Sequence, residues 1–356
     1  MGMFGRIISG ALLLAATACG SGSNAPPPKR TEFSVGWSIY AGWMPWPYAA
    51  QAGIVKKWAD KYGLKISIVQ INDYAESVNQ FTAGKLDGVT VASMDALTIP
   101  AAAGKDTSAI ITGDYSNGND GLVAKGAASL ASLKGRPINL VELSVSHYLL
   151  ARALDKAGMT LRDVKTVNTA DADIVAAFAS PDVEAAVTWN PQLSAITAQP
   201  GAKLLFSSAD VPGEIIDLLV VDTATLKANP DLGKALAGIW FETVALLQRQ
   251  DAQGKAARAA MAQMAGASPE QFDKQLATTF FYADPKAAVA ATASAALITT
   301  MTRVRDFSFS RGLFKGAASA DAVGIGFPGG KALGDPARIT LRFDERFMQM
   351  AADGAL

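Results

Sequence analysis

Aromatic side chains are concentrated in one short segment near the start of the chain. Residues 37–48 contain three of the six Trp residues and two of the seven Tyr residues. Indole and phenol faces attract cations by about 0.5–2 kcal/mol per contact, more when water is excluded. The segment therefore predicts an aromatic floor for a small cation or a planar polar molecule, and the candidate rings are Trp37, Tyr40, Trp43 and Trp46.

Acidic and other polar side chains follow further apolar runs, at the point where each run ends. None of the segments 37–48, 72–76, 93–95 and 113–121 contains Lys or Arg, which an anion site would need. A guanidinium ion fits such a site, because it stacks on rings and meets carboxylates in two places. Urea has the same planar shape without the charge. The remaining candidate ligand contacts are Asp73, Glu76, Met94, Asp95, Asp114, Asn119, Asp120, Glu142, His147 and Trp189.

Several of these residues also suit purely structural roles. Asp73 can cap the helix that follows it, with Glu76 completing a capping box, and Asp95 can cap its own helix. His147 lies near an expected helix start, and Trp189 can be a buried wall. One Cys and one His in the whole chain exclude a zinc site built on Cys/His clusters. We therefore expect no metal, no cofactor and no catalytic residues.

Two glycine-containing motifs are not interpreted as sites. Residues 324–329 match G-x-G-x-x-G, but no strand-turn-helix pattern surrounds them, so we expect a turn. Residues 114–120 resemble a calcium loop faintly, but Lys125 stands where the closing Glu would be expected.

The elements that must position these residues alternate along the chain, which predicts an α/β protein with parallel strands covered on both faces. Strands are predicted at 33–37, 64–71, 88–92, 108–112, 137–141, 164–168, 183–188, 203–207 and 216–221. Helices are predicted at 47–62, 73–83, 94–103, 146–157 and 171–179, and the chain after residue 223 reads as mostly helical. Two such α/β units in series suggest a two-lobed clamshell. In open α/β sheets, ligands bind at the carboxyl ends of the strands.

Composition supports a folded protein and disfavours nucleic acid as a partner. The chain has 356 residues, of which 50% are hydrophobic and 18% are charged, so it can bury a core. Its 32 basic residues equal its 32 acidic residues, whereas nucleic-acid binders usually carry a basic excess.

The first residues resemble a bacterial lipoprotein leader. Arg6 precedes an apolar stretch at 7–16, which is too short to span a bilayer, and small residues then surround Cys19. We expect a signal peptide at 1–18, lipidation at Cys19 and a tether at 19–31. The expected location is the periplasm or cell envelope, with the lipid as the only membrane contact. The alternative is an ordinary cleaved signal peptide with a chance Cys.

A family resemblance rests on five short segments in a fixed order, at 46–48, 81–88, 133–138, 146–150 and 183–191. They resemble the nitrate/taurine/sulfonate class of ABC substrate-binding proteins, which shares the thiamine-precursor-synthase-like fold. The resemblance covers nearly all of residues 33–305. It implies a type II periplasmic-binding-protein clamshell with crossovers near 114–123 and 212–219, one lobe from 32–118 plus 217–356, and the other from 119–216. The implied partners are an ABC permease and its ATPase.

Segments 37–48 and 113–121 further resemble a subgroup of urea transporters that accompanies urea or guanidine carboxylation genes. The expected function is therefore capture of a small guanidinium-like or urea-like solute for import, without enzymatic activity. The alternatives are a sulfonate, nitrate or thiamine-precursor-type solute, an enzyme of the same fold, and a ligand sensor. A thiamine-pyrimidine synthase would need a Lys, a His cluster and metal-linked cysteines, which one His and one Cys disfavour.

Overall fold

The computed structural model describes residues 30–356. The predicted signal peptide, Cys19 and the tether as far as residue 29 lie outside the described residues.

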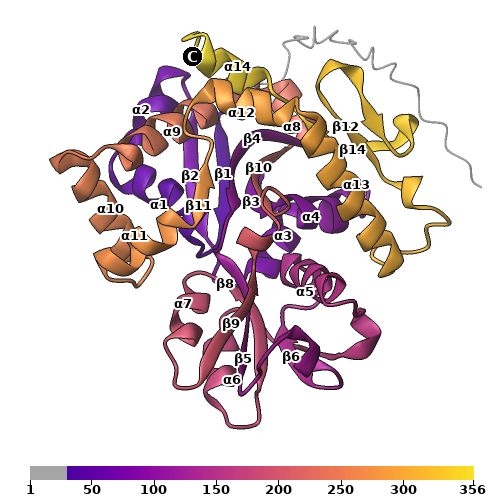
Figure 1. The fold of residues 1–356 in the computed structure, drawn as a ribbon. Coiled ribbons are helices and arrows are strands. Elements are labelled where there is room, and N and C mark those ends of the chain that lie inside the picture. The colour runs from indigo at the N-terminus through magenta and orange to yellow at the C-terminus, as the bar shows by residue number, and fades with distance from the viewer. Residues whose placement is uncertain (1–29) are drawn as a thin grey trace, which may run out of the picture. The chain divides into compact units, whose positions relative to one another are not determined.

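The described part alternates strands and helices along most of its length (Figure 1). Its strands are β1 (Glu32–Trp37), β2 (Lys65–Gln70), β3 (Gly88–Ala92), β4 (Thr107–Ser116), β5 (Asp120–Lys125), β6 (Pro137–Leu140), β7 (Lys165–Asn168), β8 (Ala185–Trp189), β9 (Ala202–Ser207), β10 (Ile216–Asp222), β11 (Thr279–Phe281), β12 (Gly324–Gly326), β13 (Ala332–Leu333) and β14 (Ile339–Phe343). Its α-helices are α1 (Pro45–Gln51), α2 (Ile54–Lys61), α3 (Tyr74–Thr82), α4 (Ser93–Ala96), α5 (Val145–Lys156), α6 (Ile174–Ala179), α7 (Gln192–Thr197), α8 (Thr223–Ala228), α9 (Pro230–Gln248), α10 (Ala252–Met264), α11 (Pro269–Ala277), α12 (Pro285–Thr292), α13 (Ala295–Ser310) and α14 (Arg346–Ala352).

The larger sheet has the strand order β13-β12-β14-β4-β10-β3-β1-β2, and β11 pairs with β4 beside this path. β1 is parallel to β2 and β3, whereas β10 is antiparallel to its two neighbours, β3 and β4. Every residue of β3 is buried, as expected for a central strand with helices on both faces. In Figure 1, α1, α2 and α9 cover one face, while α3, α4 and α13 cover the other.

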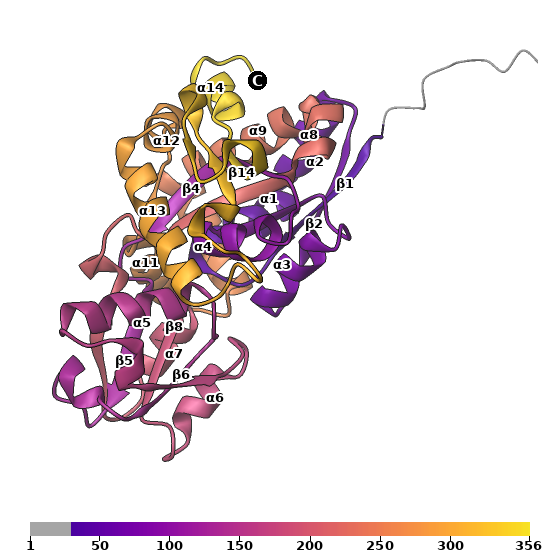
Figure 2. The ribbon, with the colours of Figure 1, turned by 90° about the vertical axis from the view of Figure 1, so that its right-hand side faces the viewer.

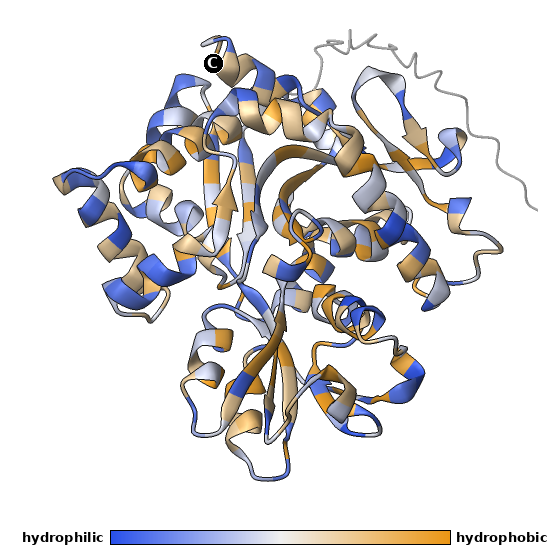
Figure 3. Cartoon of the chain, viewed as in Figure 1, coloured by the Kyte–Doolittle hydropathy of each residue, from blue (hydrophilic) through white to orange (hydrophobic). Residues whose placement is uncertain are grey.

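The smaller sheet has the order β7-β6-β8-β5-β9. Alternate residues of β5 face two separate apolar clusters: Leu122 and Ala124 pack in the cluster that contains α5, whereas Val123 packs with α6 and α7. This period of two is the ordinary consequence of strand geometry. Figure 3 shows the result in both sheets, with hydrophobic strands inside and hydrophilic helix surfaces outside.

The chain crosses between the two sheets twice, from β4 to β5 and from β9 back to β10. The larger lobe is therefore the sheet that contains β4 and β10 with its helices, and the smaller lobe is the sheet that contains β5 and β9 (Figure 2). The predicted α/β two-lobed fold with two crossover segments is confirmed.

Two local predictions were wrong, and a third was right but incomplete. The helix expected at 47–62 is two helices, because Gly53 between them adopts a left-handed conformation with φ of 77°. The region after residue 223 is mostly helical, as predicted, but it also contributes β11 and β14, which both pair with β4. The turn expected at 324–329 begins with β12, and only Pro328–Gly330 forms a short helical turn.

Among residues 30–356, no single helix is long and apolar enough to cross a membrane. The pair α12 and α13, which is bent by 55°, passes the same test of length and composition together. Both helices bury side chains in the core of the larger lobe, including Ala288 and Met301.

Candidate functional site

A small cavity lies where the two sheets meet. β3 of the larger sheet ends beside this cavity. In the smaller sheet, β5 begins and β8 ends beside it, and their residues Asp120 and Trp189 are directly paired. We call it the outer cavity, and its lining is Tyr40, Trp43, Tyr74, Ala92, Asp120, Val145, Trp189, Ile215 and Asp217.

Four rings form a connected wall of the outer cavity. Tyr40 and Trp43 meet edge to face at 5.2 Å between centroids, and Trp43 lies 5.6 Å from Tyr74. Tyr74 then meets Trp189 of the smaller lobe at 5.6 Å and 74°. Edge-to-face pairs of this kind are among the favoured aromatic geometries. The wall therefore spans both lobes.

Two of these rings carry buried polar atoms without an ordinary hydrogen bond. The indole nitrogen of Trp43 has no partner, and the hydroxyl of Tyr40 lies beside Ser116, Asp114 and Asp217 without ordinary hydrogen-bond geometry to any of them. A buried polar atom left unpaired costs about 1–3 kcal/mol. Such atoms beside a cavity are suited to bind a ligand.

Two carboxylates complete the outer cavity, and no Lys or Arg lines it. Asp120 is 2% exposed, and burial raises its pKa to about 7. Burial also raises the pKa of Asp217 well above its ordinary value, and the neighbouring charge of Asp114 raises it further. The lining therefore has no positively charged side chain, and the raised pKa values favour the protonated, neutral form of both acids.

A second, smaller cavity adjoins the outer cavity and shares Trp43 and Asp217 with it. We call it the inner cavity. Its full lining is Trp43, Trp46, Thr90, Ile111, Gly113, Asp114, Asp217, Leu218, Leu219 and Trp240.

The structure brings some of the predicted residues together and places others elsewhere. Tyr40, Trp43, Asp120 and Trp189 line the outer cavity, while Trp46 and Asp114 line the inner one. The other predicted residues line neither cavity, and they are Trp37, Asp73, Glu76, Met94, Asp95, Asn119, Glu142 and His147.

Asp95 contacts the site indirectly, through Tyr74. Its carboxylate accepts a hydrogen bond of 2.6 Å from the hydroxyl of Tyr74, which lines the outer cavity. Asp95 is fully buried, and burial raises its pKa to about 7. Asp95 and Glu142 both line a separate, wider groove between the lobes.

Four other predicted residues have structural contacts. Asp73 caps α3 by accepting the backbone N–H of Glu76 at 2.8 Å, and Glu76 accepts a hydrogen bond from Gln80. Trp37 and Met94 are buried in two different apolar clusters.

The last three predicted residues make contacts in or toward the smaller lobe. Asn119 accepts hydrogen bonds from Asn190 and Thr278, at 2.7 and 2.9 Å. Glu142 accepts a hydrogen bond from the hydroxyl of Thr166. His147 accepts the backbone N–H of Leu143 at Nδ1, and burial lowers its pKa.

Sequence reasoning missed Tyr74, Asp217 and Trp240 as cavity residues. Tyr74 stands in the segment 72–76 that follows the second strand, so its position carried a signal. Asp217 had a different signal, a single acid within the otherwise apolar run 215–221. Trp240 lies in α9, far along the chain, and no local pattern relates it to the site.

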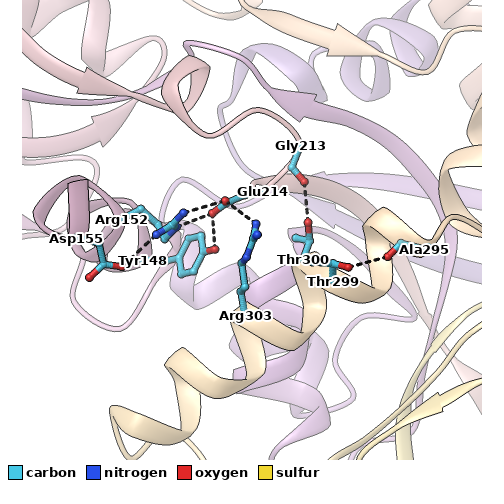
Figure 4. Close-up of polar contacts among 9 residues, drawn as sticks. All are labelled: Tyr148, Arg152, Asp155, Gly213, Glu214, Ala295, Thr299, Thr300 and Arg303. Atoms are coloured by element: carbon cyan, nitrogen blue, oxygen red, sulfur yellow. Dashed lines mark hydrogen bonds and ion pairs between the residues drawn. The ribbon is translucent and has the colours of Figure 1, made fainter.

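The second crossover is fixed by a network of charged groups beside the site (Figure 4). Glu214 accepts hydrogen bonds from the hydroxyl of Tyr148 at 2.6 Å and from Nε of Arg152 at 2.8 Å, both on α5. Arg303 of α13 donates to the same carboxylate at 3.0 Å, and Thr300 donates to the carbonyl of Gly213 at 3.3 Å. The network joins the crossover to a helix of each lobe.

The fold and cavities define a two-lobed α/β protein with a small cavity between its lobes. The chain belongs to the NMT1-like family, which it matches over residues 30–265. A protein of Brucella abortus (strain 2308), named only as a binding protein, is 33% identical over 153 residues, or 42% of this chain and 47% of that protein. The chain thus spans about half the length of the curated relatives it matches.

Solved structures share the fold. The alkanesulfonate-binding protein SsuA from Xanthomonas axonopodis pv. citri, bound to MOPS, superposes with a TM-score of 0.67 at 21% identity, covering 81% of this chain and 96% of that one. The periplasmic nitrate-binding protein NrtA from Synechocystis PCC 6803 gives 0.63 at 12% identity, covering 91% and 89%. At such identities the likeness concerns the fold alone.

Proposed function

We propose that this chain is the extracytoplasmic solute-binding component of an ABC importer, and that it captures a small planar nitrogen compound of the guanidinium or urea type. It would then deliver the solute to a membrane permease that is driven by an ATPase. The observation that carries the choice of solute is the outer cavity, in which four rings and two buried carboxylates meet without any Lys or Arg.

The chemistry of the lining supports this class of solute. A planar N–H donor can stack on the rings and donate to Asp120 and Asp217, which accept but do not donate when ionised. A sulfonate or nitrate ion would find no Lys or Arg in the lining to balance its charge, and it would bind only while both acids stay protonated. Sulfonate and nitrate, for which the structurally similar proteins SsuA and NrtA are named, remain the competing solutes.

The proposed role also assigns a function to the lipidation site, the tether and the two lobes that were predicted from sequence. A lipid on Cys19 and a tether to residue 31 would hold the protein at the cell envelope. The lobes would be 32–118 plus 217–356 and 119–216, closing around the solute by a hinge movement at the two crossovers. The buried polar atoms of Tyr40 and Trp43 that lack an ordinary hydrogen bond support a ligand between the lobes.

Tryptophan fluorescence titration of the full-length protein with guanidinium, urea, taurine and nitrate tests the proposal. We expect guanidinium or urea to saturate the signal and taurine and nitrate to leave it unchanged, because Trp43 and Trp189 line the cavity. Asp120→Asn should weaken binding at least ten-fold, or about 1.4 kcal/mol. The exposed Asp182→Asn in the smaller lobe is the matched control and should bind as the native protein does. A response to taurine or nitrate alone would refute the proposal.

A further inference from the structure

The inner cavity is built around two acids that face each other. Asp114 of β4 and Asp217 of β10 are directly paired partners in the antiparallel register. Asp114 is 0% exposed and Asp217 is 5% exposed, and both line the cavity. Like charges directly opposite on neighbouring strands are destabilising. The pair is therefore stable only when a proton or a bound cation neutralises it.

Unsatisfied polar atoms gather in the same cavity. The carboxylate of Asp114 lies beside Asp217 and Tyr40, but neither of its oxygens accepts a hydrogen bond of ordinary geometry. The hydroxyl of Thr90, which can accept, and the indole nitrogen of Trp240, which can only donate, are also buried without partners. Thr90 and Trp240 are 1% and 2% exposed, and both line the cavity. Buried acceptors are normally paired, so the free oxygens of Asp114 and Thr90 indicate a missing donor, which is either a shared proton or an N–H group of a ligand.

The groups around the pair supply no positive charge. The lining contains no Lys or Arg. The titratable groups that act on the two acids are Tyr40 and Asp120, and Tyr282 is itself close enough to sense the charge of Asp114. Burial raises the pKa of Asp114 to about 7. A ligand that carries a positive charge would restore the ionised form.

The rings favour an organic cation over a metal ion. Trp43, Trp46 and Trp240 line the cavity, and Trp46 stacks on Trp240 at 5.5 Å between centroids. Hard metal ions prefer six or more oxygen ligands, and within residues 30–356 no group of three or more His, Cys, Asp or Glu residues is arranged to hold one. Indole faces with two carboxylates suit an N–H cation.

We propose that the inner cavity holds the cationic N–H group of the ligand between Asp114 and Asp217, so that the substrate class is an organic monocation of the guanidinium type and not neutral urea. This inference rests on the proposed function. Because the two cavities share Trp43 and Asp217, a substituent on the cation extends among the rings of the outer cavity.

The backbone beside the pair is shaped for close approach. A Cβ atom at Gly42 would lie 2.8 Å from Oδ1 of Asp114 and 2.5 Å from the ring of Tyr40. Only glycine avoids both contacts, so the chain passes close to the carboxylate without covering it with a side chain.

Isothermal titration calorimetry at pH 8 with guanidinium, methylguanidinium and urea tests the inference on the full-length protein. We expect both cations to bind at least ten-fold more tightly than urea. Asp114→Asn should weaken cation binding at least ten-fold and change urea binding less than two-fold, because only the cation uses the charge. Asp182→Asn is the control, and thermal unfolding verifies that each variant is folded.

The outcomes separate this inference from the proposed function. Urea binding as tightly as guanidinium, or cation binding unchanged in Asp114→Asn, would overturn the inference and leave the proposed function standing. Binding of neither compound to the native protein would overturn both. If Asp114→Asn does not fold, the ratio of guanidinium to urea affinity of the native protein decides alone.

Discussion

At the scale of single residues, the raised pKa values of the buried acids make stability depend on pH. Burial raises the pKa of Asp114 and of Asp120 to about 7, from ordinary values near 4. The folded state therefore holds protons that the unfolded chain has already lost between about pH 4 and pH 7. Stability from these groups is fully present below the unfolded pKa and is lost as the pH rises through about 7.

We predict that the melting temperature of the ligand-free protein falls as the pH rises from 5.5 to 8. Each acid contributes up to about 1.4 kcal/mol per pH unit in this range, and the burial-lowered pKa of His147 opposes part of it. Heat is the suitable denaturant, because urea and guanidinium are candidate ligands. Asp114→Asn should flatten the slope, whereas Asp182→Asn should not. A melting temperature that rises with pH over this range would contradict the prediction.

Residues of the site could be predicted from sequence where they follow the carboxyl end of a strand, because ligands bind there in open α/β sheets. Tyr40 follows β1 and Trp189 ends β8, and both line the outer cavity. The rule describes parallel strands, but β10 runs antiparallel to β3 and β4. Its beginning, and not its end, therefore meets the cavity, and Asp217 was missed for that reason.

At the scale of elements, one carboxylate ties the second crossover to two helices. Burial works to raise the pKa of Glu214, but hydrogen bonds from Arg152 and Tyr148 outweigh it, and the pKa is lowered. The ionised form is thus favoured in the folded state, and its stability is present above the unfolded pKa. Arg303 of α13 binds the same group, so α5 and α13 are held through a single side chain.

We predict that Glu214→Gln lowers the free energy of unfolding at pH 7 by about 1–3 kcal/mol, because it leaves Arg303 without its counter-charge and Arg152 with Asp155 alone. Thermal unfolding measures the loss. Glu184→Gln is the matched control, since Glu184 pairs with Arg136 at the surface and such pairs are worth at most about 1 kcal/mol. Equal losses in the two variants would show that the network does not hold the crossover.

Elements with a local signal were predicted well, and elements defined by distant partners were not. β3 is a short apolar run that contains two Val residues, and α3 begins directly after its capping residue, Asp73. By contrast, β14 lies between β12 and β4 in the larger sheet, and β4 is more than two hundred residues earlier in the chain. Residues 339–343 alternate apolar and polar side chains, which favours a strand, but the sequence does not show which distant strand they pair with.

At the scale of the whole described unit, the ring contact between Tyr74 and Trp189 links the lobes across the outer cavity. Tyr74 belongs to the larger lobe and Trp189 to the smaller one, so a ligand between them would be enclosed only while the lobes are together. The contact between the crossovers, a hydrogen bond of 2.6 Å between Ser116 and Ser208, does not depend on a ligand. Ligand residence should therefore depend on the rings.

We predict that Trp189→Ala raises the dissociation rate of guanidinium about ten-fold and changes its association rate less than three-fold. Loss of one ring contact costs about 0.5–2 kcal/mol, and differences in affinity within one site usually arise in the dissociation rate. Stopped-flow fluorescence, followed through the remaining tryptophans, separates the two rates. Trp58→Phe is the control, because Trp58 lies on α2 and hydrogen-bonds Glu242 away from both cavities. A change confined to the association rate would mean that Trp189 guides entry and does not retain the ligand.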